Sequence, residues 1–126
     1  MPLQRNPAYP IVVVDDERAA LDGFEIALAT AGYTNVVAIE DSRNVLSFLE
    51  GHKVELILLD LIMPHVSGGE LLVEIRRRIP ETPVIIVSAV NEIDSVVECM
   101  RNGATDYILK PVELEQFKSR VRTCLE

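Results

Sequence analysis

The chain has 126 residues, which is enough for one domain with a hydrophobic core of its own. Hydrophobic residues make up 48% of it and charged residues 25%, a balance that excludes an intrinsically disordered segment, a collagen and a coiled coil. The formal net charge of −8 argues against a segment that binds nucleic acid by itself, because such binding depends largely on basic side chains that neutralise phosphates.

Strand and helix patterns alternate along the chain. Residues 1–9 are expected to be a loose N-terminal leader, and residues 10–126 to be one folded domain. Short apolar runs, rich in β-branched residues, predict five strands: Ile11–Val14, Val36–Ile39, Leu56–Leu59, Val84–Val87 and Tyr107–Leu109. Apolar residues at helical spacing predict five helices, within the ranges 17–31, 42–51, 71–79, 93–100 and 114–124. Residues 60–69, with one proline and two glycines, are predicted to form a loop.

This alternation predicts an α/β domain with a parallel sheet and helices on both faces, because right-handed crossovers place the helices there. The two cysteines, Cys99 and Cys124, are too few and too far apart for a disulfide framework or a zinc site, and we expect both to be buried and reduced. The run Arg76–Arg78 is expected to be a solvated helix face. No apolar run is long enough to span a bilayer and no signal peptide is present, so we expect a cytoplasmic protein without a membrane partner.

Polar residues stand at the C-terminal ends of four of the predicted strands. Asp15 and Asp16 follow the first strand, Asp60 the third, Ser88 the fourth and Lys110 the fifth. In an open parallel sheet the carboxyl ends of the strands meet at the edge where ligands bind, so these side chains are expected to converge. An Asp pair before a helix is equally typical of helix capping, and a Ser after a strand usually caps. The functional interpretation depends on all five residues together.

Three clustered carboxylates repel one another and favour a hard dication with oxygen ligands, of which Mg2+ fits best. A carboxylate can also accept a phosphoryl group as an aspartyl phosphate. In that reaction Lys110 would neutralise charge on the transferred group, and Ser88 could donate a hydrogen bond to one of its oxygens.

With these residues the sequence resembles the bacterial response-regulator receiver domains of two-component systems. The resemblance is carried by Asp15-Asp16, by Asp60-Leu61-Ile62-Met63-Pro64, by Ser88-Ala89, and by Tyr107 with Lys110-Pro111. It extends over nearly the whole chain, and the motifs occur in the family's order and at similar separations. It implies a flavodoxin-like fold with strand order 2-1-3-4-5.

The resemblance also implies roles for single residues. Asp60 would be the phosphoacceptor, with the phosphoryl group coming from a histidine kinase or a phosphotransfer protein. Mg2+ would be held by Asp15, Asp16, Asp60 and the backbone carbonyl of Ile62. Further roles are implied for Ser88, the Ala89 backbone and Lys110 as phosphoryl-binding groups, for Ser88 and Tyr107 as the switch, and for Lys110-Pro111 as a cis peptide.

The resemblance implies a switch rather than an enzyme, because the domain assists only its own phosphorylation and dephosphorylation. Its output surface would be the helix within residues 93–100, the strand Tyr107–Leu109 and the helix within residues 114–124, acting on an output domain, a transcription regulator or a second copy. Two alternatives stay open. One is a metal-dependent phosphatase with an aspartyl-phosphate intermediate, which Ile62 disfavours because such enzymes place a proton-transferring Asp there. The other is a docking domain that works without phosphorylation.

Overall fold

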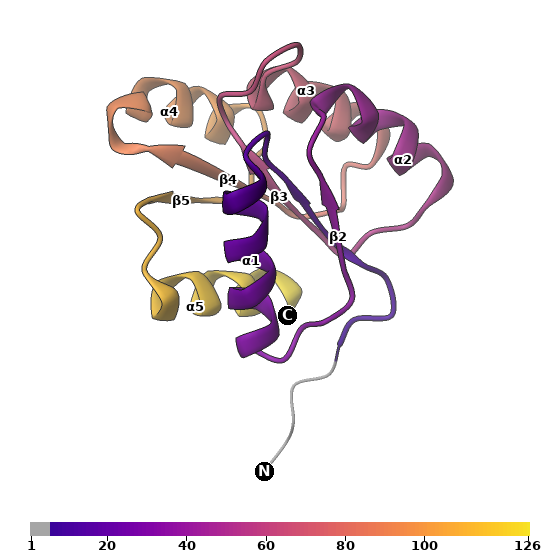
Figure 1. The fold of residues 1–126 in the computed structure, drawn as a ribbon. Helices are drawn as coiled ribbons and strands as arrows, with labels where there is room; N and C mark the ends of the chain where they lie inside the picture. Colours follow the sequence, from indigo (N-terminus) through magenta and orange to yellow (C-terminus); the bar gives the residue numbers. More distant parts are fainter. Residues whose placement is uncertain (1–5) are drawn as a thin grey trace.

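The computed structural model describes residues 6–126, with the side chain of Val90 left out. Five strands alternate with five α-helices along this range (Figure 1). The strands are β1 (Ile11–Val14), β2 (Val36–Ile39), β3 (Leu56–Asp60), β4 (Val84–Ala89) and β5 (Asp106–Lys110). The helices are α1 (Arg18–Thr30), α2 (Val45–Gly51), α3 (Gly68–Arg78), α4 (Ile93–Arg101) and α5 (Leu114–Leu125). Two 3₁₀ turns, η1 (Ser42–Asn44) and η2 (Val90–Glu92), precede α2 and α4.

All neighbouring strands of the sheet are parallel, and their order is β2-β1-β3-β4-β5. This confirms the predicted α/β class and the strand order that the family resemblance implied. Strands β1, β3 and β4 are buried on both faces along nearly their whole length, which explains why they are continuous apolar runs rather than alternating ones.

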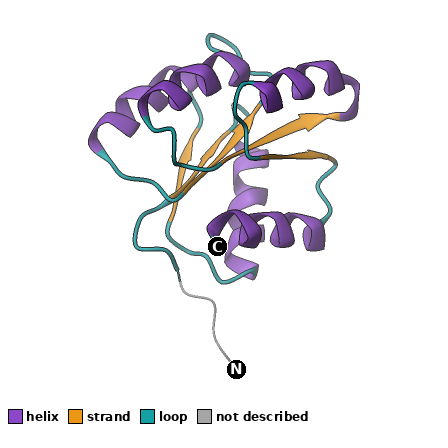
Figure 2. Cartoon of the chain, turned by 180° about the vertical axis from the view of Figure 1, so that it is seen from behind, coloured by secondary structure: helices purple, strands orange, loops and turns teal. Residues whose placement is uncertain are grey.

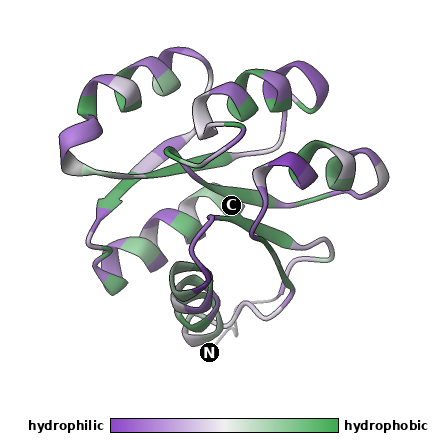
Figure 3. Cartoon of the chain, turned by 45° about the horizontal axis from the view of Figure 1, so that its top comes forward, coloured by the Kyte–Doolittle hydropathy of each residue, from purple (hydrophilic) through white to green (hydrophobic). Residues whose placement is uncertain are grey.

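The sheet separates two hydrophobic cores (Figures 1 and 2). Odd and even strand residues point to opposite faces, so Ile11 and Val13 pack against α1 and α5, while Val12 and Val14 pack toward α2, α3 and α4. On the α1–α5 side, the rings of Phe24 and Phe117 stack with their centroids 5.8 Å apart. Figure 3 shows that most of the sheet is hydrophobic, whereas hydrophilic and hydrophobic residues are mixed along the helices.

Two expectations about side chains need correction. Arg76 does not belong to a solvated face, because its guanidinium donates to the carbonyl oxygens of Gly103 and Thr82, at 2.6 Å each. It thereby ties the end of α3 to the loops that precede β4 and β5, whereas Arg77 and Arg78 are exposed as predicted. Cys99 is buried, but Cys124 is only half-buried because it lies in the last turn of α5; both thiols are free.

The N-terminal part of the described chain has no regular secondary structure before β1. Residues 1–5 of the predicted leader lie outside the described residues. Asn6 contacts the loop after α1, where its Oδ1 accepts a hydrogen bond from the Thr34 backbone N–H at 2.6 Å. In the described part of the chain, no helix has both the length and the apolar composition needed to cross a bilayer.

Helix α3 begins at Gly68 rather than at Leu71, because Ser67 provides a cap that the apolar pattern does not reveal. The Ser67 hydroxyl accepts from the Glu70 backbone N–H, and the Glu70 carboxylate accepts from the Ser67 N–H. At this point the helix presses against the end of β3: the Gly68 N–H donates to the Leu61 carbonyl at 2.8 Å. A Cβ on Gly68 would collide with the carbonyl oxygen of Asp60.

This close approach predicts a sharp difference between two adjacent glycines. Gly68→Ala should lower the free energy of unfolding by about 1–3 kcal/mol, because backbone must move to admit the methyl group. Gly69→Ala should leave it unchanged or raise it by up to about 1 kcal/mol, since its Cβ would make only ordinary contacts and Ala favours the helix. Urea unfolding of both variants tests this, and equal effects at the two positions would contradict it.

Candidate functional site

Three carboxylates meet at the C-terminal edge of the sheet. Asp15 and Asp16 follow β1 directly, and Asp60 is the last residue of β3. Each offers one oxygen, and these oxygens lie within 4.8 Å of one another. Asp15 is completely buried and Asp60 is 7% exposed, whereas Asp16 is exposed. The predicted convergence of these three residues is therefore present, with Asp16 on the side that solvent and ligands can reach.

The ammonium group of Lys110 lies between the two buried carboxylates. Its Nζ is 3.2 Å from Asp60 Oδ1 and 3.4 Å from Asp15 Oδ2. Burial alone would lower the pKa of Lys110, but the charges and hydrogen bonds of Asp60 and Asp15 outweigh it, so its pKa is raised and the side chain is charged. Lys110 ends β5, and its peptide bond to Pro111 is cis, as the resemblance implied.

The pKa of Asp60 reflects its burial and the charge balance of the cluster. Its burial, and next the negative charge of Asp15, raise the pKa of Asp60 to about 6, although Lys110 acts in the opposite direction. Two buried or nearly buried carboxylates and a third close by exceed what one ammonium neutralises. A hard cation with oxygen ligands relieves that excess, and the three oxygens suit Mg2+, which is usually held by a few carboxylates together with water.

The end of β4 supplies two potential donors to the same edge. Ser88 is fully buried, and its hydroxyl is one of the buried side-chain groups in the described residues that have no hydrogen-bond partner. Ala89 lies opposite Lys110 in the β4–β5 register, and its backbone N–H donates to Glu92 Oε1 at 2.8 Å. A buried hydroxyl without a partner is rare in native structures, and here it marks a place where a ligand oxygen would be accommodated.

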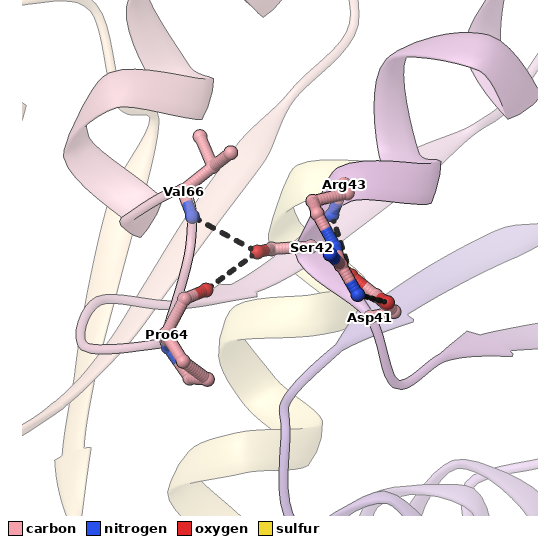
Figure 4. A network of polar contacts seen from close by, with 5 residues as sticks. All are labelled: Asp41, Ser42, Arg43, Pro64 and Val66. Atoms are coloured by element: carbon pink, nitrogen blue, oxygen red, sulfur yellow. Dashed lines mark hydrogen bonds and ion pairs between the residues drawn. The ribbon is translucent and has the colours of Figure 1, made fainter.

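The loop after Asp60 is held by a residue that was not among the predicted site residues (Figure 4). The hydroxyl of buried Ser42 donates to the Pro64 carbonyl at 2.9 Å and accepts from the Val66 N–H at 3.2 Å. Ile62 lies in this loop with a side chain 60% exposed. Asp41 caps the turn η1 by accepting from the Arg43 N–H, which leaves the Ser42 hydroxyl free to hold the loop.

Tyr107 lies in β5, half-buried and packed against the α2–α3–α4 core. The Arg120 guanidinium carbon stands 5.7 Å from the centroid of its ring, and Arg120 Nη1 pairs with Asp106 Oδ1 at 2.6 Å. The aromatic ring therefore lies between the interior and the surface made by α4, β5 and α5. Arg120 and Asp106 were not among the predicted site residues, because nothing in the one-dimensional pattern brings them together.

The raised pKa of Asp60 predicts a pH-dependent cost of keeping it ionised. The penalty is absent below about pH 4, grows as pH rises toward 6, and reaches up to about 3 kcal/mol above that. In EDTA, Asp60→Asn should therefore be more stable than the parent at pH 7.5, and the difference should vanish near pH 4. Urea unfolding between pH 4 and 8 measures it. Asp94→Asn, an exposed control in α4, should show no such trend, and parallel curves for parent and Asp60→Asn would contradict the account.

Comparison with known proteins agrees with this geometry. The family model described as the response regulator receiver domain matches residues 11–122. The response regulator protein FleR of Pseudomonas aeruginosa is 35% identical over 106 residues, which are 84% of this chain and 22% of FleR. The transcriptional regulatory protein MalR of Bacillus subtilis is 35% identical over 99 residues, 79% of this chain and 38% of MalR. The chain thus spans well under half the length of these two relatives.

Solved structures give the same result. The receiver domain of NtrX from Brucella abortus is 29% identical and superposes with a TM-score of 0.86, covering 91% of this chain and 97% of that domain. A receiver-domain protein from Clostridium thermocellum is 26% identical with a TM-score of 0.86, covering 93% of this chain and 94% of that one. Fold, sequence and strand-end residues agree, and the chain belongs to the response regulator receiver-domain family of two-component systems.

Proposed function

We propose that the chain is a phosphorylation-controlled switch in which Asp60 accepts a phosphoryl group from the phosphohistidine of a histidine kinase or a phosphotransfer protein. The single observation that supports this best is the Lys110 ammonium, held between Asp60 and Asp15 at the edge of the sheet. Family membership supports the switching role. The identity of the acceptor residue is our proposal.

In the proposed transfer a carboxylate oxygen of Asp60 attacks phosphorus, the phosphorus–nitrogen bond of the donor breaks, and its electron pair leaves with the imidazole. Lys110 already touches Asp60, so its charge would offset the added negative charge of the phosphoryl oxygens. The Ser88 hydroxyl, which has no hydrogen-bond partner, and the Ala89 N–H would donate to two of those oxygens.

A divalent cation, Mg2+, belongs to this proposal. Asp15, Asp16, Asp60 and the carbonyl of Ile62 would hold it, and the three carboxylate oxygens within 4.8 Å of one another support that assignment. When bound, the cation would screen the carboxylates from the incoming phosphoryl oxygens. Asp60 and Asp15 are held in place by Lys110, and the exposed Asp16 is accessible from solvent.

The proposed output is a change in the surface made by α4, β5 and α5. Ser88 and Tyr107 lie on the adjacent strands β4 and β5, and Tyr107 is half-buried between the core and the surface. A ring that moves inward would alter the Arg120 contact and the exposed face of α4, which carries Val97 and Met100. This surface is where we place the contact with an output domain or with a second copy.

The longer relatives are named as response and transcriptional regulators, and we propose gene control as the wider role of a cytoplasmic protein that contains this domain. Nucleic acid would then be contacted by another segment, since the net charge of −8 disfavours direct binding here. A metal-dependent phosphatase is less well supported, because Ile62 cannot transfer a proton. A docking domain independent of phosphorylation would not explain the unpartnered Ser88 hydroxyl.

Labelling with acetyl phosphate tests the acceptor. With Mg2+ present, mass spectrometry after borohydride trapping should find one adduct, on Asp60, and EDTA should abolish it because the unscreened carboxylates repel the phosphoryl group. Asp60→Asn should not be labelled at all. Asp94→Asn provides the matched control and should be labelled like the parent. An adduct on Asp15 or Asp16, or labelling that persists in EDTA, would overturn the proposal.

A further inference from the structure

A hydrogen bond between a side chain and the backbone spans the junction between β4 and α4. Strand β4 ends at Ala89, and η2 (Val90–Glu92) turns directly into α4. Within this turn the carboxylate of Glu92 reaches back and accepts the backbone N–H of Ala89, with 2.8 Å between Oε1 and N. The contact is partly buried, and Glu92 is also the residue from which α4 starts.

Two neighbouring hydrogen-bond donors at this strand end therefore differ: one has an acceptor and the other has none. The Ser88 hydroxyl is buried without any hydrogen-bond partner, while the N–H of Ala89, one residue further, is already occupied by a carboxylate. Ala89 pairs in register with Lys110, whose ammonium touches Asp60. The occupied N–H thus belongs to the end of β4, the strand that pairs with β3 at the proposed acceptor Asp60, and the group that occupies it is an anion.

We propose that Glu92 is a positioning residue that stands in for a phosphoryl oxygen at the Ala89 N–H, so that phosphorylation of Asp60 must displace it. This inference rests on the proposed function, in which Ala89 donates to the phosphoryl group. One N–H serves one strong acceptor, and two anions at one donor repel each other. Glu92 and the phosphoryl group are therefore mutually exclusive at this site.

The displacement of Glu92 by the phosphoryl group connects the site to the output surface made by α4, β5 and α5. When Glu92 leaves Ala89, the turn η2 loses the side-chain hydrogen bond from its last residue back to the end of β4, and α4 begins directly after this turn. At the same step the Ser88 hydroxyl gains the partner that it lacks. The carboxylate of Glu92 consequently holds the unphosphorylated arrangement, and its release couples phosphoryl binding to the position of α4.

A merely structural role for Glu92 predicts the opposite change in affinity for a phosphoryl analogue when Glu92 is removed. If the carboxylate only stabilised the turn, its removal would disorder the β4–α4 junction and weaken the binding of any phosphoryl analogue. If Glu92 competes for the Ala89 N–H, its removal destabilises the unmodified protein and at the same time strengthens binding of the analogue. Stability and affinity must then move in opposite directions.

Beryllofluoride with Mg2+ is the probe, and its dissociation constant is measured by 15N–1H NMR of the intact chain together with urea unfolding. Glu92→Ala should bind about fivefold more tightly than the parent, the size expected for losing one partly exposed charge-assisted competitor, and should unfold at lower urea. Glu92→Gln keeps a neutral acceptor, so its affinity for beryllofluoride and its stability in urea should lie between those of the parent and of Glu92→Ala. Glu98→Ala, which changes an exposed glutamate of α4, should match the parent.

The Ala89 amide provides a second readout that needs no fluoride. Its proton signal should move in Glu92→Ala and stay in place in Glu98→Ala. Weaker or unchanged binding by Glu92→Ala overturns the inference, and so does an equal gain by Glu98→Ala, which would show a general charge effect. If the parent and every variant fail to bind beryllofluoride, the proposed function itself is wrong and the inference falls with it. If the parent binds beryllofluoride and Glu92→Ala binds it with the same affinity, the inference about Glu92 is wrong and the proposed function is unaffected.

Discussion

The ammonium of Lys110 lies within 3.4 Å of two carboxylates that the fold buries at the end of its sheet. Asp15 has no exposed surface and Asp60 almost none, so neither charge can be hydrated as it would be in water. One cation for two buried anions and a third nearby leaves excess negative charge. Burial first, and then that excess negative charge, raise the pKa of Asp60 to about 6. The excess favours the binding of positive charge at this edge.

The surrounding structure keeps this strained cluster in place. Glycine at position 68 lets α3 approach the carbonyl of Asp60, and Ser42 ties down the loop that follows. Arg76 fastens the far end of α3 to the loops at Gly103 and Thr82. Toward α4, the buried Ser88 hydroxyl lacks a hydrogen-bond partner, and the Glu92 carboxylate bonds back to the Ala89 N–H. Packing and hydrogen bonds therefore fix the β3–α3 side of the site, whereas we expect the β4–α4 side to rearrange when a ligand binds.

Much of the fold could be predicted from the sequence. The five strands contain apolar runs long enough to identify, and polar residues at their ends were correctly expected to converge, because parallel strands end at one edge. Strand ends were set too short: Asp60, Ser88 and Lys110 belong to strands, since the backbone ladder continues after the apolar run stops. An apolar pattern cannot mark a polar residue that pairs only through its backbone.

Contacts between distant or unpatterned residues could not be predicted in this way. The hydroxyl of Ser42 bonds to Pro64 and Val66, more than twenty positions away, and its neighbour Asp41 offered the same capping chemistry. The Glu92 contact is local, but Glu at that spacing is common and acquires meaning only beside an unpartnered Ser88. Arg76 was misread because its two neighbours are exposed arginines and its acceptors are backbone carbonyls.

The most direct test of the central claim is the effect of Mg2+ on stability, without any phosphoryl donor. The claim is that the carboxylate cluster is a cation site, so bound Mg2+ should stabilise the folded chain by mass action. At free Mg2+ ten times its dissociation constant, the free energy of unfolding should rise by about 1.4 kcal/mol over NaCl of equal ionic strength. Asp16→Asn removes an exposed ligand without disturbing the core and should lose most of this gain. An equal gain in both proteins, or none in the parent, would contradict the account.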